Sequence, residues 1–396
     1  MKHYNYIFTG SGLSALMTVY EMVLSNKFED KTILLIDENS KKANDRTWCF
    51  WDENTPPFGH PSGRGEIFPN IISKKWSTAI FADKNMTREL ILEPYQYKMV
   101  KGLDFYTLVF DELSKHSNIH FVNQKVIDFQ ELGNHCVVKT DTESFTCNQI
   151  FNSIFIPEPI KNQAKYPFLH QHFIGWFIKS NQAVFNPDFA TFMDFSVEQK
   201  GNTRFMYVLP TSETEALIEY TLFSTDLLSK EEYENEILNY IQKLGIIEYE
   251  IIEKERGNIP MTSYEFWKHN TKNIINIGSA GGWTKASTGY TFKNTTKKSK
   301  ALVQFLQTET DFSKFHKKNK FWFYDLLFLD VLNRRNDLGS KVFSALFKKG
   351  NPTLILKFLD EETSLWEDLQ VIWKCPKGLF IKALFHRIIN FKMFDN

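Results

Sequence analysis

Residues 4–24 read "YNYIFTGSGLSALMTVYEMVL", and this stretch decides the fold. An apolar run at its start predicts a short strand, and apolar residues that then recur at spacings of three and four predict a helix. Between the two lie Gly10, Gly12 and Ala15 in a G-x-G-x-x-A pattern. A strand, a glycine turn and a helix in this order are typical of folds that bind the ADP part of a dinucleotide.

Each of these positions has a physical reason. Gly10 allows a tight turn, Gly12 lets the backbone approach a pyrophosphate at the helix N-terminus, and the small Ala15 lets helix and strand pack closely. A second apolar run, "TILLID", ends at Asp37, whose carboxylate can accept hydrogen bonds from a ribose diol. That carboxylate should repel a 2′-phosphate, which favours FAD or NAD over NADP. The alternative is a glycine turn that holds no ligand.

The composition limits the possible classes of function. The 396 residues suggest two or three domains, or one large nucleotide-binding fold with an inserted domain. Lys and Arg number 47, as do Asp and Glu, and a net charge of +0 argues against a nucleic-acid partner. The four cysteines are scattered, which predicts no disulfide framework, no metal site and a reducing cytoplasm. No signal peptide and no membrane-spanning run are expected.

A second glycine-rich turn lies late in the chain, in "NIINIGSAGGWTKASTGYTF" at 273–292. Such turns close FAD folds over the ribityl chain and the pyrophosphate, so we expect this turn to pack beside the first one. The residues predicted to contact the cofactor here are Gly278, Ser279, Gly281 and Gly282. A helix is expected to follow, from about Thr291 to Leu306.

The segments between the two turns are predicted to be mainly β-structure. Short strands with turns at Gly133-Asn134 and near Asp141 are expected first, and Val126 on one of them is a further candidate for the cofactor site. The apolar and aromatic alternation of 165–223 then predicts an antiparallel sheet. Helices are expected at 103–115 and 230–244 and throughout the last 90 residues of the chain.

Together these strings resemble the bacterial lycopene beta-cyclases. The matching blocks run in family order from residue 7 to about 292 and include "FTGSGLSAL", "DRTWCFW", "HFIGWFI", "FMDF", "YVLP", "LIEYT", "ERGNIPMT" and "IGSAGGWTKASTGYTF". The resemblance implies an α/β, Rossmann-like FAD-binding fold of the glutathione-reductase or hydroxybenzoate-hydroxylase type, with an antiparallel-sheet substrate domain and C-terminal helices. The expected domains are FAD-binding at 1–160 and 270–305, substrate-binding at 161–269 and helical at 306–396.

The resemblance also implies an activity. The linear psi ends of lycopene, or of other carotenoids with such ends, would close to beta-ionone rings, giving gamma-carotene and then beta-carotene. The family needs reduced FAD although no net electrons move, and NAD(P)H is the expected external reductant. Two positions depart from other FAD enzymes: Ser279 stands where many carry Asp, and "FNS" at 151–153 stands where many relatives have Asp in the middle.

Glu219, in "ALIEYTLFS", is predicted to be the catalytic acid. An alkene is a weak base, so its acid must stay protonated, and burial among apolar neighbours raises the pKa of a carboxyl. On a strand Glu219 shares a face with apolar residues, and it occupies the position of the family's catalytic Glu. Asp194, in "TFMDFSV", is a second catalytic candidate that could serve proton traffic or hold Arg204 or the flavin. The alternative for each is a buried or edge carboxylate with a structural role.

Aromatic residues are predicted to surround the substrate. In a desolvated site the face of an indole ring stabilises a cation by about 2 kcal/mol. The candidates are Trp48, Trp51, Trp176 and Trp283, with core packing as the alternative for each. Arg46, in "RTWCFW" after the second strand, is predicted to contact the flavin phosphates or the ribityl chain.

The C-terminal run "KCPKGLFIKALFHRIINFKMF" interleaves apolar and basic residues. This pattern predicts a basic amphipathic helix that lies on a membrane surface, which suits an insoluble substrate. We therefore expect a cytoplasmic protein bound peripherally to the inner membrane. The alternative is a surface helix packed on the body. The competing functions are a flavin oxidoreductase, such as a hydroxylase or an isoprenoid reductase, and a non-catalytic carotenoid or flavin carrier.

Overall fold

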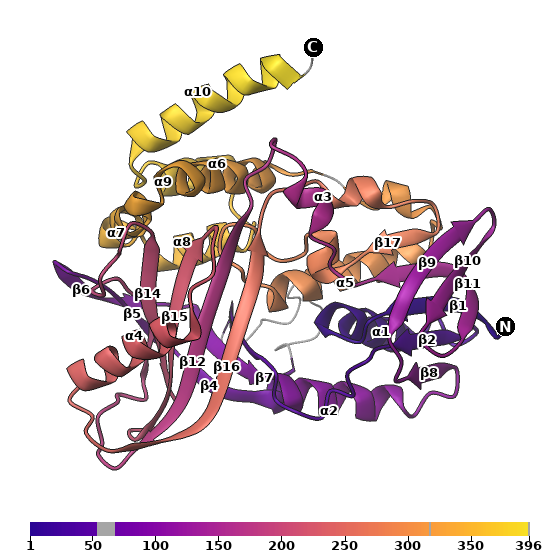
Figure 1. Cartoon of the computed structure of the whole chain (residues 1–396), viewed down its shortest axis with the longest axis horizontal. Helices are drawn as coiled ribbons and strands as arrows, with labels where there is room; N and C mark the ends of the chain where they lie inside the picture. The colour runs from indigo at the N-terminus through magenta and orange to yellow at the C-terminus, as the bar shows by residue number, and fades with distance from the viewer. Residues whose placement is uncertain (54–67, 317, 395–396) are drawn as a thin grey trace.

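The computed structural model describes residues 1–53, 68–316 and 318–394, with side chains up to residue 389. These residues form two seven-stranded sheets and one three-stranded sheet, with helices on their faces (Figure 1). The mixed α/β architecture that the sequence predicts is confirmed.

The first seven-stranded sheet carries the opening motif. β1 (His3–Thr9) pairs in parallel with β2 (Ile33–Ile36) and with β11 (Ser144–Asn152), and α1 (Leu13–Ser25) connects β1 to β2. The predicted order of strand, turn, helix and strand is therefore confirmed. The other strands of this sheet are β8 (Ile119–Val122), β9 (Val126–Leu132), β10 (His135–Thr140) and β17 (Ile274–Asn276).

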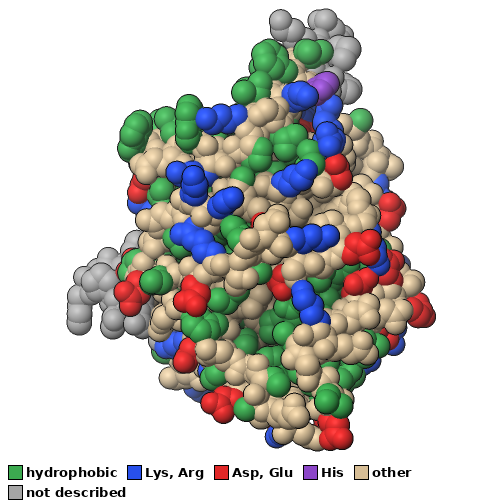
Figure 2. Space-filling view, turned by 90° about the vertical axis from the view of Figure 1, so that its left-hand side faces the viewer, with side chains coloured by type: hydrophobic (Ala, Val, Ile, Leu, Met, Phe, Trp, Pro, Cys, Tyr) green, Lys and Arg blue, Asp and Glu red, His purple; other side chains and the backbone are tan. Residues whose placement is uncertain are grey.

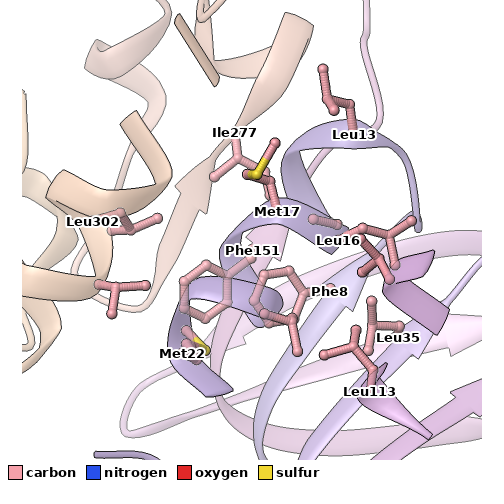
Figure 3. Packing of buried hydrophobic residues seen from close by; sticks show 14 of the residues in the cluster. Phe8, Leu13, Leu16, Met17, Met22, Leu35, Leu113, Phe151, Ile277 and Leu302 are labelled. Atoms are coloured by element: carbon pink, nitrogen blue, oxygen red, sulfur yellow. The ribbon is translucent and has the colours of Figure 1, made fainter. Parts of the chain in front are cut away.

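Apolar side chains of α1 hold the helix on this sheet (Figure 3). Leu16 and Met17 are fully buried, and Phe8 stacks on Phe151 with the ring centroids 4.3 Å apart. Each large apolar side chain buried in this way contributes about 1.5–3 kcal/mol. The glycine turn between β1 and α1 is thereby held in place by the core.

The second seven-stranded sheet is larger and mostly antiparallel, with the order β16-β12-β15-β14-β13-β5-β6 and a parallel pairing between β13 and β5. Five of its strands lie where the sequence predicts an antiparallel sheet: β12 (Leu169–Ser180), β13 (Phe189–Asp194), β14 (Thr203–Pro210), β15 (Glu215–Ser224) and β16 (Tyr249–Met261).

Two strands of this sheet were not expected there. β5 (Thr78–Asp83) and β6 (Met86–Ile91) come from the region assigned to the FAD-binding domain, yet they extend the large sheet at its edge. The predicted domain boundaries therefore miss a crossing of the chain between the two sheets. Pairing between strands so distant in sequence leaves no local pattern that could have shown it.

A three-stranded sheet and several helices complete the body of the molecule. The small sheet has the order β3-β7-β4. In the sequence, β3 and β4 come before the strands β5 and β6 of the second large sheet, and β7 comes after them. Its strands are β3 (Thr47–Glu53), β4 (Ile72–Trp76) and β7 (Tyr95–Lys101). Besides α1, the α-helices up to residue 306 are α2 (Gly102–Leu113), α3 (Glu158–Lys161), α4 (Lys230–Lys243) and α5 (Phe292–Leu306).

The C-terminal region is helical, as predicted. Among the residues that the structure describes, no helix is long and apolar enough to cross a membrane. The final helix projects from the body at the top of Figure 1. The helices of this region are α6 (Lys320–Arg335), α7 (Gly339–Lys349), α8 (Pro352–Leu359), α9 (Leu365–Ile372) and α10 (Lys377–Phe394).

The two faces of the large sheet have different surroundings. Ile218, Tyr220 and Leu222 of β15 point to one face and pack in a buried cluster with residues of α4. The alternate residues Leu217 and Phe223 point to the other face and join the cluster that includes residues of α6, α7 and α8. This second face also borders the cavity described below.

Candidate active site

The first glycine turn is tightly built at one position and open at another. Gly10 has a φ of 108°, and a Cβ atom there would lie 2.2 Å from the Ser153 Oγ. A Cβ atom on Gly12, which precedes the first residue of α1, would meet no atom within 4 Å. The turn therefore excludes a side chain at Gly10 and leaves free space above Gly12, as a bound pyrophosphate would require.

Asp37 lies beside this turn. Its Oδ2 accepts hydrogen bonds from the backbone N and the Oγ of Ser11, at 2.7 Å and 3.1 Å. Lys41 approaches the same carboxylate at 3.6 Å. The acid at the end of β2 is thus drawn to the glycine turn, the position that a ribose-binding carboxylate occupies in this kind of fold. Ala15 is fully buried one turn into α1, consistent with its predicted packing role.

The late glycine turn packs against the start of α1. Gly278 has a φ of 60°, and a Cβ atom there would lie 2.5 Å from the Ser14 Oγ. Gly278 and Ser279 border the same cavity as Gly12, so the structure brings the two turns together. Gly281 and Gly282 instead face protein: Cβ atoms there would lie 2.1 Å from a backbone oxygen and 2.8 Å from a Phe266 ring carbon. These two glycines shape the turn and do not line the cavity.

One cavity of about 470 Å³ joins these turns to the large sheet. Gly12 and Ser279 of the glycine turns line its polar end, and Glu219 lies at the end formed by the sheet. Arg46 and Trp48 also line the cavity. The Arg46 side chain is 59% exposed and lies 3.9 Å from Asp45. Free space above a helix N-terminus, a nearby acid and an accessible Arg fit the phosphates and the ribose of a dinucleotide.

Glu219 is held as a buried carboxyl on the cavity wall. Only 6% of the residue is exposed, and the Thr221 hydroxyl donates a hydrogen bond to its Oε1. Burial raises the pKa of Glu219 well above its usual value, and the nearby carboxyl of Glu255 raises that pKa further. Leu217 and Phe223 line the cavity on the same strand, so the predicted apolar face is the cavity face.

Glu255 of β16 was missed from the sequence. It lines the cavity, and burial raises its pKa to about 7. The Thr47 hydroxyl donates to its Oε2 at 2.7 Å. Its only signal was its place in the "ERGNIPMT" block at the centre of a charged strand, where Glu250 and Glu253 are equally good candidates. Nothing local distinguishes these three carboxyls.

Three tyrosines of the cavity wall were also missed. The Tyr97 hydroxyl lies 2.6 Å from that of Tyr207 and 3.1 Å from that of Tyr290. Burial raises the pKa of all three phenols, so each hydroxyl is neutral near pH 7. In the strand register Tyr207 stands directly opposite Glu219. The tyrosines come from three separate segments of the chain, which only the fold brings together.

Comparison with known proteins decides the family. The sequence model described as Lycopene cyclase protein matches residues 6–384. The chain belongs to the lycopene cyclase family. A search among curated proteins gives no match.

Solved structures show the fold of this lycopene cyclase family member. A geranylgeranyl bacteriochlorophyll reductase-like protein from Thermoplasma acidophilum matches with a TM-score of 0.61 and 12% identity, over 98% of this chain and 100% of the other. A flavoprotein/dehydrogenase from Cytophaga hutchinsonii matches with a TM-score of 0.62 and 12% identity, over 97% and 100%. Klebsiella pneumoniae HpxO complexed with FAD, in a variant form, matches with a TM-score of 0.55 and 12% identity, over 95% and 100%. The fold is therefore of the Rossmann-like FAD-binding type.

Of the four tryptophans predicted to surround the substrate, only Trp48 lines the cavity of this lycopene cyclase family member. Trp48 lines the cavity and packs edge-to-face on Phe105 at 5.4 Å between ring centroids. Trp51 is buried behind the cavity wall against Tyr290, at 4.6 Å. Trp283 is buried in the cluster around α1. The structure does not bring Trp51 or Trp283 to the cavity surface, because both rings fill the core beside it.

Trp176 lies on the face of the sheet that points away from the cavity. It is 3% exposed, it belongs to the cluster with residues of α4, and the Lys254 Nζ lies 4.5 Å from its ring centroid. Its neighbour Gly175 is on the cavity side, opposite Glu219. Side chains alternate along a strand, so a one-residue difference exchanges the two faces.

We expect Trp176→Ala in this cyclase-family protein to destabilise the fold without altering the cavity. Loss of a buried indole should lower the free energy of unfolding by about 3–5 kcal/mol, because it leaves a void in the packed cluster. Urea unfolding followed by circular dichroism measures this loss. Flavin content per folded protein should match that of the unsubstituted chain, and a stable variant that has lost its flavin would contradict the core assignment.

Two further candidates also lie outside the cavity. Asp194 is buried on β13, where its Oδ2 accepts from the Tyr240 hydroxyl at 2.8 Å and its Oδ1 accepts from the Ser196 backbone at 2.8 Å. Arg204, its predicted partner, instead pairs with Glu232 at 2.8 Å. Asp194 therefore fixes the β13 turn against α4, which is the structural alternative. Val126 packs on the apolar cluster at the far face of the first sheet from α1, away from the glycine turns.

Proposed function

We propose that the protein is an FAD-dependent lycopene beta-cyclase. The observation that carries this proposal is one cavity that holds a buried, proton-retaining Glu219 at one end and two glycine turns at the other. The family membership supplies the substrate class. The alternative is an FAD-dependent oxidoreductase on the same fold.

The chain's own acid would start the reaction. Glu219 would donate its proton to the terminal double bond of a psi end, leaving a tertiary cation. The next double bond in reach would attack this cation, forming the ring C–C bond and moving the positive charge to a ring carbon. Loss of one proton from the adjacent ring carbon would restore a double bond. One proton is added and one is lost, so each ring has the composition of the linear end.

The residues at the polar end fit FAD. The pyrophosphate would lie on the N-terminus of α1 above Gly12, the ribose beside Asp37, and the ribityl chain or phosphates near Arg46, with Gly278 and Ser279 facing them. When bound in its reduced form, FAD would supply negative charge close to the cation, without net electron transfer. NAD(P)H is the proposed source of the reducing electrons.

The cavity wall would protect the cation from capture. Water would quench a carbocation to an alcohol, so the site must exclude it while still offering favourable electrostatics. Phe205 and Phe223 line the cavity together with Trp48 and Tyr207. Their ring faces would stabilise positive charge without forming a bond to it.

Expression in lycopene-producing bacteria tests this function. The proposed cyclase would convert the pigment to gamma- and beta-carotene, which chromatography separates. An oxidoreductase would instead give a product of different mass and consume NAD(P)H in step with it. Unaltered lycopene in cells that contain folded, FAD-loaded protein would rule out the cyclase.

We further propose that the substrate is taken from a membrane at α9 and α10. Trp366 lies on α9 and is 71% exposed, and Trp373 directly follows α9 and is 70% exposed. The Lys377 Nζ lies 3.3 Å from the Trp373 ring centroid. In Figure 2 the upper part of the molecule carries hydrophobic side chains interspersed with Lys and Arg. Exposed indoles beside cations suit the interface of an anionic bilayer. The other exposed apolar residues here are Leu365, Leu369, Ile381, Phe385, Ile388 and Ile389.

The predicted basic face of α10 needs one correction. Arg387 is 9% exposed and its Nε donates to the Asp330 Oδ2 of α6 at 2.9 Å. Ala383 is buried on the same side of the helix. This side of α10 anchors it on the body, and the exposed apolar side is left for the bilayer. Phe391 and Lys392, also part of the predicted pattern, lie beyond the side chains that the structure describes.

We expect the double substitution Trp366→Ala and Trp373→Ala to weaken binding to anionic vesicles by about tenfold, which corresponds to ~1.4 kcal/mol. Co-sedimentation with vesicles measures the bound fraction. Deletion of residues 377–396 should reduce it as well. Ile247→Ala removes an apolar side chain that is 82% exposed elsewhere on the surface and serves as the matched control. Equal sedimentation of all variants would contradict this surface.

A further inference from the structure

A second carboxyl stands beside Glu219 in the same row of the large sheet. In the strand register Gly175 of β12 lies opposite Glu219 of β15 on one side and opposite Glu255 of β16 on the other. The row therefore reads Glu219, Gly175, Glu255 across three adjacent strands. Both glutamates of this row line the cavity.

Gly175 leaves the room in which the two glutamates meet. A Cβ atom at this position would lie 3.2 Å from the Glu255 Cγ and 3.4 Å from the Glu219 Cβ. It would also lie 2.9 Å from the Leu217 Cδ1. The φ of Gly175 is not in the left-handed region, so backbone conformation does not require glycine here. Glycine is required here because the side chains of Glu219 and Glu255 come so close to this position.

The two side chains lie on either side of Gly175 in this row, and each carboxyl shifts the pKa of the other: Glu255 raises the pKa of Glu219, and Glu219 lowers the pKa of Glu255. Each also accepts from one hydroxyl, Glu219 from Thr221 and Glu255 from Thr47. Two buried carboxyls that share a site repel each other when both are ionised, which favours a proton on one of them. Among the residues that the structure describes, no Lys or Arg lowers the pKa of either carboxyl, so no cation there removes the need for that proton.

We propose that Glu219 and Glu255 share one proton and act as a pair, with Gly175 as the gap that permits their contact. The inference rests on the proposed cyclase function and deepens it. Before reaction the pair carries one proton and one negative charge. When Glu219 gives its proton to the alkene, the pair becomes doubly negative as the substrate becomes a cation. The proton lost from the ring carbon then returns to the pair, which restores the starting state.

The proposed cyclisation places two requirements on its acid, and a pair of carboxyls meets both better than a single carboxyl does. The acid must keep its proton near neutral pH, and the negative charge of ionised Glu255 opposes ionisation of Glu219. The cation must then be stabilised at once, and two carboxylates at the cavity wall do so more strongly than one. The other titratable or charged side chains facing the pair are Cys49, Tyr97, Tyr207, Glu253, Arg256 and Tyr290.

Glu255→Gln tests the pair through the pH profile of cyclisation in FAD-loaded protein. A neutral amide removes the charge that keeps the proton on Glu219, so the pKa of Glu219 falls. The alkaline limb of kcat should move to lower pH by about one unit or more, a tenfold change in the proton affinity. Glu255→Asp should restore part of this limb. The control is Glu215→Gln, also on β15, which removes a surface ion pair with Lys179 at 3.1 Å and should leave the profile unchanged.

Infrared spectroscopy of the FAD-loaded protein gives a second readout that does not depend on turnover. The C=O stretch of the protonated carboxyl should change in frequency in Glu219→Gln, because Glu255 is left without its partner. In Glu255→Gln and in Gly175→Ala it should titrate away at lower pH than in the unsubstituted chain. Failure of the unsubstituted protein to convert lycopene would overturn the cyclase function, while the infrared titration would still report on the pair. Normal cyclisation with the same pH limb and the same titration in Glu255→Gln would overturn the pair alone.

Discussion

Glu219→Gln is expected to lower the rate of lycopene cyclisation by about 10²–10⁴-fold, the usual effect of removing a positioned general acid. Glutamine keeps the shape of the side chain and can still hydrogen bond to Thr221, but it has no proton to donate to an alkene. Pigment chromatography of reactions with equal amounts of FAD-loaded protein measures the loss. The retained flavin shows that the cavity has survived the substitution.

Stability measurements provide an independent check on the state of Glu219. Burial raises the pKa of this carboxyl in the folded chain above its ordinary value of 4.5. Its contribution to stability is therefore fully present below that value and is lost as the pH rises through the folded pKa. Glu219→Gln should gain stability relative to the unsubstituted chain as the pH rises. A rate near that of the unsubstituted enzyme, or a stability difference independent of pH, would argue that Glu219 is not the buried acid.

Gly12→Asp is expected to weaken FAD binding strongly while leaving the fold intact. A side chain at this position meets no atom within 4 Å, and the backbone is extended with φ −80° and ψ −173°. Aspartate is moreover a favourable residue before the first turn of a helix. It would, however, fill the space proposed for the pyrophosphate and add a negative charge there. Affinity should fall by about 10²-fold or more, or ~2.7 kcal/mol.

Flavin fluorescence titration of the apoprotein measures this loss, and thermal unfolding of the apoprotein reports on the fold. Gly12→Ala is the matched control, because it adds one methyl group without a charge and should have a smaller effect. Tight FAD binding by Gly12→Asp would place the pyrophosphate elsewhere. An unfolded variant would contradict the open space seen above Gly12.

The sequence predicted the strand, turn and helix around Gly10 and Gly12 correctly, because the signals for these elements are local. Gly10, Gly12 and the helix that follows are contiguous, and a strand that ends in Asp37 comes next in the chain. Each strand and helix of this βαβ unit has its own period of apolar residues, and the glycines and Asp37 have a characteristic spacing. The βαβ unit could therefore be predicted without knowledge of any contact between residues distant in the sequence.

The cavity wall formed by the large sheet was predicted only in part, because it depends on which strands pair and which face is covered. Alternation along β15 was enough to place Glu219 among apolar neighbours. Alternation along β12 could not show that Gly175 faces the cavity and Trp176 faces α4, since both faces of this strand are apolar. Glu255 reaches the site through the pairing of β12 with β16, a contact between residues 80 positions apart in the chain.

One measurement tests the central claim most directly. Purified, FAD-loaded protein is reduced and given lycopene in H₂O and in D₂O, and the products are analysed by chromatography and mass spectrometry. An acid-initiated cyclisation predicts a cyclic product with the mass of lycopene in H₂O. In D₂O that mass should rise by one deuterium for each ring formed, because the acid exchanges its proton with the solvent when the product leaves the cavity. A product that has gained oxygen or two hydrogens, with NAD(P)H consumed in equal amount, would contradict the account.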